Sequence, residues 1–336
     1  MSLRQRMKAL ARRVLQPAPG ARLSNAVRNR LLTAVSLSRI RRDSVLWPRR
    51  PEAINFEITS ICDARCIHCP REEMDRRMKP MDLALFRKLI DQAAELGVPE
   101  LVPNGYGEIL TIRNLEDYLG HVSGKAHPFQ VVINTNGYRM TEEKIELFLR
   151  HRVRLLNICL DGATAETAEK VRVQLELGQI EANIRRLMAL RRERGLDYPQ
   201  VRVGMIVIPQ NRHEVDAFLA KWRGVVDYVG LGGVSNRAGS LSSELLVGGG
   251  QGRVQACVLP FRELNVYSDG KAVLCCDDWN EEYVVGDLNT QSLEEIWRGE
   301  ALTRARQAHL ESRGAELPVC AKCNLWRDPG PARLWA

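Results

Sequence analysis

Three cysteines at short spacing are the first residues whose type and pattern could do chemistry. Cys62, Cys66 and Cys69 form a Cys-x3-Cys-x2-Cys sequence within eight residues. Thiolates this close together can bind one metal centre. A structural zinc site takes four ligands, and His68 is the neighbouring side chain that could complete one. A three-thiolate iron–sulfur cluster instead leaves one iron open to a cofactor or substrate, and the spacing alone allows both.

A second group of cysteines lies near the C-terminus. Cys257, Cys275, Cys320 and Cys323 supply four thiols, which suit either zinc or a closed iron–sulfur cluster. Cys276 competes with Cys275 for one ligand place. Because successive side chains on a strand point to opposite faces, only one of the two is expected to face the other thiols.

The composition is that of a globular protein and favours metal binding by the cysteines. The chain has 336 residues, 45% of them hydrophobic and 27% charged. Its apolar runs are shorter than the roughly 20 residues of a membrane span, and its start lacks a secretory signal. We therefore expect a cytoplasmic protein. Eight of its nine cysteines fall into the two groups, and clustered thiols in a reducing compartment are typical metal ligands.

The net charge of +8 belongs to one end of the chain. Residues 1–50 hold thirteen Lys or Arg and one acid, Asp43, a net charge of +12. The remaining residues carry 36 bases and 40 acids, a net charge of −4. A nucleic-acid-binding enzyme usually has its basic surface on the body, so no nucleic-acid partner is expected. The apolar spacing from Leu3 to Leu32 predicts amphipathic helices, which either pack on the body or contact an anionic membrane or an acidic partner.

The middle of the chain alternates strands and helices. This order predicts a parallel sheet, because parallel strands require crossover connections. Six such units suit a partial (β/α)6 barrel with ligands at the carboxyl ends of its strands. The predicted strands are Ile54–Ile58, Glu100–Pro103, Gln130–Asn134, Leu155–Leu160, Val201–Ile208 and Tyr228–Leu231, and the predicted helices are Leu83–Leu96, Asn114–Val122, Glu142–His151, Ile180–Arg194 and Val215–Trp222.

The C-terminal third has a different pattern. Residues 263–275 read as a hairpin around Ser268-Asp269-Gly270. Ser292 and Glu295 form a capping box for a helix expected to run to Leu310. The predicted organisation is a basic helical extension (1–50), a β/α domain (51–235), a linker (236–252) and a small C-terminal domain (253–336).

The cysteine loop directly after the first predicted strand resembles the radical S-adenosylmethionine (SAM) superfamily, over residues 52–330. The resemblance implies that Cys62, Cys66 and Cys69 bind a [4Fe–4S] cluster and that SAM chelates its open iron. It further implies reductive cleavage of SAM to a 5′-deoxyadenosyl radical, which abstracts hydrogen from a substrate. A flavodoxin- or ferredoxin-like protein would supply the electron.

Other segments match positions that contact SAM in this superfamily. His68 stands at the aromatic position near the adenine, and Gly107 and Glu108 resemble the motif that holds the SAM ammonium group, although Ile109 replaces its usual proline. Asn136 ends a strand facing the cofactor, or forms a plain turn. Arg172 is placed to pair with the SAM carboxylate, or is a surface residue. At a position where relatives have Ser, Cys159 is either a core thiol or a hydrogen donor to a substrate radical.

The C-terminal cysteines resemble the SPASM/twitch type with one auxiliary [4Fe–4S] cluster. A full SPASM region carries seven cysteines for two clusters, more than this chain has. The resemblance favours Cys275 over Cys276 as a ligand with Cys257, Cys320 and Cys323. A closed auxiliary cluster would handle an electron.

Three functions are compatible with these features. The leading hypothesis is a radical SAM oxidoreductase that acts on a small polar substrate such as a sugar, an aminocyclitol or a nucleoside. The second is a peptide-modifying maturase, and the third is a non-catalytic iron–sulfur carrier or sensor.

Overall fold

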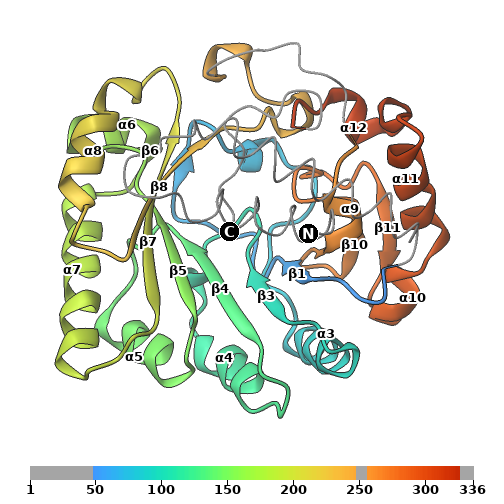
Figure 1. Ribbon diagram of the computed structural model, residues 1–336, viewed down its shortest axis with the longest axis horizontal. Coiled ribbons are helices and arrows are strands. Elements are labelled where there is room, and N and C mark those ends of the chain that lie inside the picture. Colours follow the sequence, from blue (N-terminus) through green and yellow to red (C-terminus); the bar gives the residue numbers. More distant parts are fainter. Residues whose placement is uncertain (1–47, 247–255, 326–336) are drawn as a thin grey trace, which may run out of the picture.

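The computed structural model describes residues 48–246 and 256–325, and its centre is a nine-stranded, mainly parallel sheet (Figure 1). The strand order is β11-β10-β9-β1-β3-β4-β5-β7-β8. The strands are β1 (Ala53–Phe56), β3 (Glu100–Pro103), β4 (Gln130–Thr135), β5 (Leu155–Cys159), β7 (Gln200–Val207), β8 (Tyr228–Gly233), β9 (Glu263–Val266), β10 (Lys271–Val273) and β11 (Val284–Asp287).

The predicted alternation of strands and helices is confirmed. Every neighbouring pair from β1 to β8 is parallel. The helices lie outside the sheet and cover one face of it (Figure 1). These helices are α3 (Leu83–Leu96), α4 (Leu115–Ser123), α5 (Glu142–Arg150), α6 (Ala165–Val171), α7 (Leu177–Glu193) and α8 (Val215–Trp222).

Local sequence explains where these elements begin and which face they bury. Asp82 starts α3, where its carboxylate accepts hydrogen bonds from the backbone N–H groups of Ala84 and Leu85. Gly97 ends the helix in the left-handed conformation, with φ of 69°. In β1, Ile54 and Phe56 are buried in the main hydrophobic core. Asn55 lies on the opposite face, because side chains alternate along a strand.

The C-terminal hairpin continues the main sheet. β9 pairs in parallel with β1, and Asn265 lies beside Asn55 in this register. β10 then pairs antiparallel with β9, and β11 with β10. Residues about 200 positions apart in the sequence therefore share one face of the sheet.

The C-terminal helix expected over residues 292–310 is interrupted. The capping box of Ser292 and Glu295 is present, but the chain forms two helices, α10 (Leu293–Trp297) and α11 (Glu300–Leu310). Gly299 lies at the break, with an extended backbone that starts α11. Two short helices, α9 (Leu259–Arg262) and α12 (Pro318–Lys322), complete this part of the chain.

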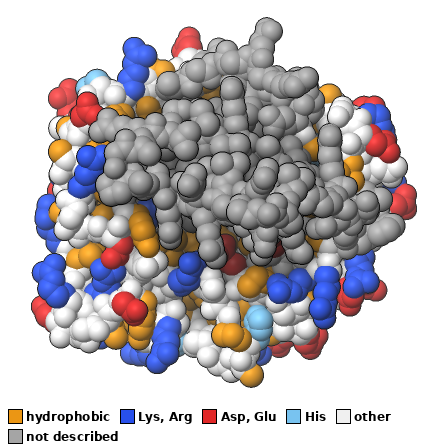
Figure 2. Space-filling model, in the orientation of Figure 1, with side chains coloured by type: hydrophobic (Ala, Val, Ile, Leu, Met, Phe, Trp, Pro, Cys, Tyr) orange, Lys and Arg blue, Asp and Glu red, His pale blue; other side chains and the backbone are white. Residues whose placement is uncertain are grey.

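The described surface has mixed charge on the face in view, with basic and acidic side chains interspersed below the grey atoms (Figure 2). Within residues 48–246 and 256–325, no helix is long and apolar enough to cross a membrane. The amphipathic helices and membrane contact predicted for residues 1–50 fall almost entirely outside the described residues. So does the part of the predicted linker from residue 247 to residue 252.

Candidate functional site

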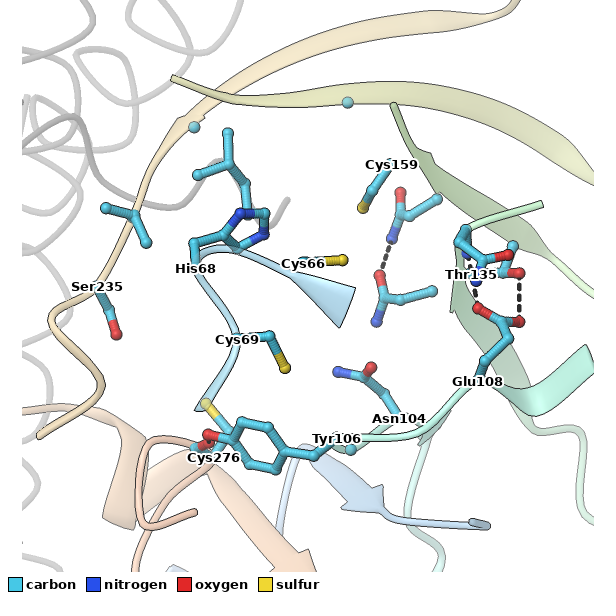
Figure 3. A pocket seen from close by; sticks show the side chains of 18 of the residues that line it. Cys66, His68, Cys69, Asn104, Tyr106, Glu108, Thr135, Cys159, Ser235 and Cys276 are labelled. Carbon is cyan, nitrogen blue, oxygen red and sulfur yellow. Dashed lines mark hydrogen bonds between the residues drawn. The ribbon is translucent and has the colours of Figure 1, made fainter. Parts of the chain in front are cut away.

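One cavity lies at the carboxyl ends of the parallel strands, where the (β/α) pattern predicts ligands. Its volume is about 270 Å³. Strands β1, β4, β5, β7, β8 and β9 and the loops that follow β1 and β3 supply its walls (Figure 3). It contains residues from both cysteine-bearing parts of the chain, including Cys66, Cys69 and Cys276.

The first three cysteines lie on the loop after β1. Cys66 belongs to β2 (Arg65–Cys66), which pairs antiparallel with β6 (Arg172–Val173) and so fixes Cys66 beside Arg172. Cys66 and Cys69 line the cavity. Cys62 packs against the hydrophobic core, where its sulfur accepts a hydrogen bond from the backbone N–H of Ala64 at 3.5 Å.

The chemistry of these donors fits an iron–sulfur cluster. In the described part of the chain, no three Cys, His, Asp or Glu side chains already form a metal-binding group. Burial raises the pKa of the Cys62 thiol to about 11 and that of the Cys66 thiol to about 12. A buried thiolate requires a strong positive partner, and a bound metal supplies one. These partly buried thiols on one loop are therefore suited to cluster binding.

Arg172 and His68 share one buried carboxylate. Nη2 of Arg172 lies 2.8 Å from Oδ2 of Asp161, and Nε2 of His68 lies 3.6 Å from the same oxygen. The Arg172 Nη1 atom also lies 3.7 Å from Sγ of Cys66. Burial lowers the pKa of His68 to about 4, so its ring is neutral at pH 7. Arg172 is thus a buried residue of the cavity wall and not the surface residue considered as an alternative.

Glu108 also lines the cavity, but its own chain holds its carboxyl group (Figure 3). Oε1 accepts hydrogen bonds from the Thr135 hydroxyl at 2.6 Å and from the backbone N–H of Leu110 at 3.0 Å. Oε2 accepts a hydrogen bond from the backbone N–H of Asn136 at 2.7 Å. Burial raises the pKa of this carboxyl to about 7. Glu108 therefore links the loop after β3 to the end of β4.

Asn136 and Gly107 position the same loops. The Asn136 amide donates to Oδ1 of Asp63, on the cysteine loop, at 2.8 Å. Gly107 lies so close to that loop that an added Cβ would be 2.1 Å from the carbonyl oxygen of Thr59. Only glycine fits there. Both residues line the cavity together with Cys159, whose thiol pKa is raised by burial.

Among the C-terminal cysteines, Cys275, Cys320 and Cys323 are buried and Cys257 is half-buried. Burial raises the pKa of the Cys257 thiol, and the neighbouring Cys320 and Cys323 raise it further. Burial likewise raises the pKa of the Cys275 thiol, to which Cys257 contributes. Cys275 is buried, whereas Cys276 lines the cavity. Both residues follow the end of β10 (Lys271–Val273), so the expected strand alternation does not apply to them. Their different surroundings favour Cys275 as the member of the C-terminal group.

Sequence reasoning missed several cavity residues. Tyr106 donates its hydroxyl to the carbonyl oxygen of Cys276 at 2.7 Å. Ser235, at the end of the predicted β/α domain, and Arg237, in the predicted linker, bind opposite oxygens of Asp277 at 2.8 and 3.0 Å. Four asparagines also line the cavity, and they are Asn55, Asn134, Asn157 and Asn265. All but Asn134 stand between larger apolar residues of a strand, and this repeated pattern could have identified them.

Comparison with known families decides what this arrangement is. A model of the radical SAM superfamily matches residues 56–221, and a model of the SPASM iron–sulfur cluster-binding domain matches residues 257–324. The chain belongs to the radical SAM superfamily. It is a radical SAM enzyme, so the non-catalytic carrier is excluded. Its two matched regions imply a [4Fe–4S] cluster with SAM and auxiliary iron–sulfur binding.

Three comparisons show the range of this radical SAM enzyme's relatives. The S-adenosyl-L-methionine-dependent 2-deoxy-scyllo-inosamine dehydrogenase of Niallia circulans is 21% identical over 273 residues, which are 81% of this chain and 92% of that protein. The crystal structure of BtrN in complex with AdoMet and 2-DOIA has a TM-score of 0.56 at 20% identity, covering 81% of this chain and 92% of that chain. The crystal structure of Streptococcus suis SuiB bound to the precursor peptide SuiA has a TM-score of 0.61 at 11% identity, and the match covers 90% of this chain and 78% of that chain. The chain spans less than half the length of the next curated relatives that it matches.

Proposed function

We propose that this radical SAM enzyme oxidises a hydroxyl group of a small polar substrate, such as a sugar, an aminocyclitol or a nucleoside, to a carbonyl group. The observation that carries the proposal is a single cavity lined by Cys66 and Cys69 of the first cysteine group and by Cys276, the residue that follows Cys275 of the second group. The likeness to a SAM-dependent dehydrogenase over 92% of that protein's length supports the same reaction type.

Cys62, Cys66 and Cys69 hold the SAM-binding cluster in this proposal, and Cys257, Cys275, Cys320 and Cys323 hold one auxiliary cluster. When bound, SAM and the first cluster supply a hydrogen-abstracting radical, and the second cluster supplies an electron acceptor. An external one-electron reductant of the flavodoxin or ferredoxin kind serves the first cluster. The six parallel strands of residues 51–235 act as a partial barrel around the substrate, and the described C-terminal residues 256–325 lie beside it.

The surrounding residues orient these groups. Arg172, fixed by Asp161 at 2.8 Å, places a positive charge beside Cys66 and the SAM carboxylate. His68 is neutral and packs beside the adenine without adding charge. Glu108 holds the ends of β3 and β4 together and offers its carboxyl to the SAM ammonium group.

The test is anaerobic turnover of the cluster-reconstituted protein with SAM, a chemical reductant and a panel of polyols. We expect one member to raise 5′-deoxyadenosine formation and to yield a product two hydrogen atoms lighter. Deuterium at the reacting carbon should appear in 5′-deoxyadenosine. Clean SAM cleavage with no carbonyl product from any polyol would contradict the proposal.

A peptide-modifying maturase is the second candidate, favoured by the likeness to SuiB bound to its precursor peptide over 90% of this chain. Peptides encoded beside the gene provide the test in the same assay. Loss of two hydrogen atoms from such a peptide, together with no conversion of any polyol, would establish this alternative.

A further inference from the structure

Asn265 lies on β9 of the C-terminal region, and its side chain faces the cavity. Leu264 and Val266, its neighbours along the strand, are buried in the main hydrophobic core. Because successive side chains of a strand point to opposite faces, Asn265 lies on the other face, where it lines the cavity together with Tyr267. In the parallel pairing of β1 with β9 it stands beside Asn55, which also lines the cavity.

The amide of Asn265 is buried without a hydrogen-bond partner. The residue is 2% exposed, and within the described part of the chain neither its Oδ1 nor its Nδ2 has a partner. The amide of Asn55, on the neighbouring strand, instead donates to Oε2 of Glu263 at 2.9 Å. Buried polar groups of folded proteins are nearly always paired, so each exception requires an explanation. At the wall of a cavity, a bound molecule that completes these hydrogen bonds is such an explanation.

The tyrosines nearest to Asn265 have already used their hydroxyl protons. Tyr267 donates to the carbonyl oxygen of Asp278 at 2.9 Å, and Tyr106 donates to that of Cys276 at 2.7 Å. The two rings pack edge to face, with their centroids 6.4 Å apart. Asn265 therefore supplies a hydrogen-bond donor to this part of the cavity that neither tyrosine can supply.

Two adjacent hydroxyl groups match a carboxamide. The Nδ2 group of Asn265 donates to the oxygen of one hydroxyl, and the other hydroxyl donates to Oδ1. An ammonium group only donates and a carboxylate only accepts, so either would leave half of the amide unpaired. A peptide bond both donates and accepts, and its binding is therefore an outcome that the test must distinguish.

We propose that Asn265 determines substrate specificity by binding two adjacent hydroxyl groups of a ring polyol. The proposal rests on the proposed function and names the substrate feature that the cavity selects. Asn265 lies within residues 257–324, the part of the chain that matches the SPASM domain. This region then contributes to substrate recognition as well as to cluster binding.

Calorimetric binding to the full-length, cluster-reconstituted protein tests this role apart from turnover. The protein is saturated with SAM under anaerobic conditions, without reductant. The probes are myo-inositol, glucose and uridine, each paired with an analogue that lacks one hydroxyl: a deoxyinositol, 2-deoxyglucose and 2′-deoxyuridine. We expect the tightest-binding polyol to exceed its deoxy analogue about tenfold or more in affinity, because the analogue leaves a buried amide atom unpaired.

Two variants assign this preference to the Asn265 side chain. Asn265→Val should weaken that polyol about tenfold or more, bind the deoxy analogue within about twofold of wild type and leave SAM affinity unchanged. Asn265→Ala should behave in the same way. If the branched side chain of valine prevents folding, the alanine variant makes every comparison.

Asn55→Val is the matched control for stability. It breaks the hydrogen bond to Glu263 and should lower the melting midpoint by about 2–4 °C. Asn265→Val removes an amide that has no partner among the described residues, so the midpoint should stay the same or rise. A fall as large as that of Asn55→Val would assign Asn265 a structural role and overturn the proposal.

Binding results can overturn the proposal in two further ways. Wild-type polyol affinity in both Asn265 variants would show that the amide does not recognise hydroxyl groups. An equal loss of SAM affinity would assign the amide to the cofactor.

Failure of the proposed function has its own signature. Polyol oxidation that Asn265→Val leaves unchanged would refute this inference alone. Binding of a peptide encoded beside the gene, with no binding or oxidation of any polyol, would refute the inference and the proposed function together.

Discussion

His309 donates a hydrogen bond to the sulfur of Cys320. Its Nε2 atom lies 3.4 Å from Sγ, while Nδ1 accepts the backbone N–H of Cys257 at 3.3 Å. Because Nδ1 is the acceptor, the ring proton is on Nε2. Burial lowers the pKa of His309 to about 4, which keeps the ring neutral.

This contact predicts that His309 raises the reduction potential of the auxiliary cluster. A hydrogen bond to a ligand sulfur stabilises the more negative, reduced state. His309→Phe should therefore lower the potential by about 50 mV, the equivalent of roughly 1 kcal/mol for one electron. Redox titration followed by electron paramagnetic resonance measures it. His309→Gln, which retains a side-chain N–H, should recover part of the shift, and equal potentials in wild type and His309→Phe would refute the role.

Gly107→Ala should destabilise the protein and weaken SAM binding. The new methyl group would lie 2.1 Å from the Thr59 carbonyl oxygen and push the cysteine loop away from the loop after β3. We expect a loss of about 1–3 kcal/mol in the free energy of unfolding. Gly178→Ala is the control, because the space around that position in α7 is open. It should be neutral or stabilise by up to about 1 kcal/mol. Urea unfolding of both variants makes the comparison, and similar losses would contradict the packing argument.

Glu108→Gln should change how stability depends on pH. The folded pKa of Glu108, about 7, is above its ordinary value of 4.5, so the native state binds a proton more tightly than the unfolded state. The proton on Glu108 therefore contributes roughly 3 kcal/mol to the free energy of unfolding below about pH 4.5, and this contribution is lost as the pH rises through 7. Denaturation midpoints from pH 4.5 to 8 should decline less steeply for the glutamine variant. Parallel curves would show that Glu108 does not cause the decline.

Asp161→Asn should be strongly destabilising because it leaves the buried Arg172 guanidinium without its carboxylate. The expected loss is about 3–5 kcal/mol, and adding Arg172→Met should recover part of it. Lys170 and Glu166 provide the control, since they form an exposed i,i+4 pair. Glu166→Gln should cost less than about 0.5 kcal/mol. Thermal and chemical unfolding of the three variants makes the comparison, and equal losses in Asp161→Asn and Glu166→Gln would contradict the prediction.

The sequence predicted the parallel part of the sheet well because its strands are short apolar runs between amphipathic helices. Asn55 and Asn265 show the limit of such reasoning. Their common face depends on the parallel pairing of β1 with β9, and no local pattern specifies a partner some 200 residues away. The break at Gly299 was missed because a capping box marks only where a helix starts.

Individual site residues were predictable by type but not by contact. Gly107 and Glu108 follow β3 as expected and line the cavity. The Glu108 carboxyl accepts hydrogen bonds from Thr135 and Asn136. These contacts depend on how the ends of β3 and β4 meet, which the sequence does not specify. Arg172 reaches Asp161 and Cys66 because β6 pairs with β2. Each of these strands is only two residues long, so no sequence pattern predicts their pairing.

Formation of 5′-deoxyadenosine by the anaerobically reduced, cluster-reconstituted protein tests the central claim most directly. We predict that wild type cleaves SAM, that Cys66→Ala does not, and that Cys320→Ala retains cleavage while losing the oxidised product. Iron content of about eight atoms per chain should accompany two full [4Fe–4S] clusters. A wild-type protein with intact clusters and no 5′-deoxyadenosine, or a Cys66→Ala variant that cleaves SAM at the wild-type rate, would contradict the account.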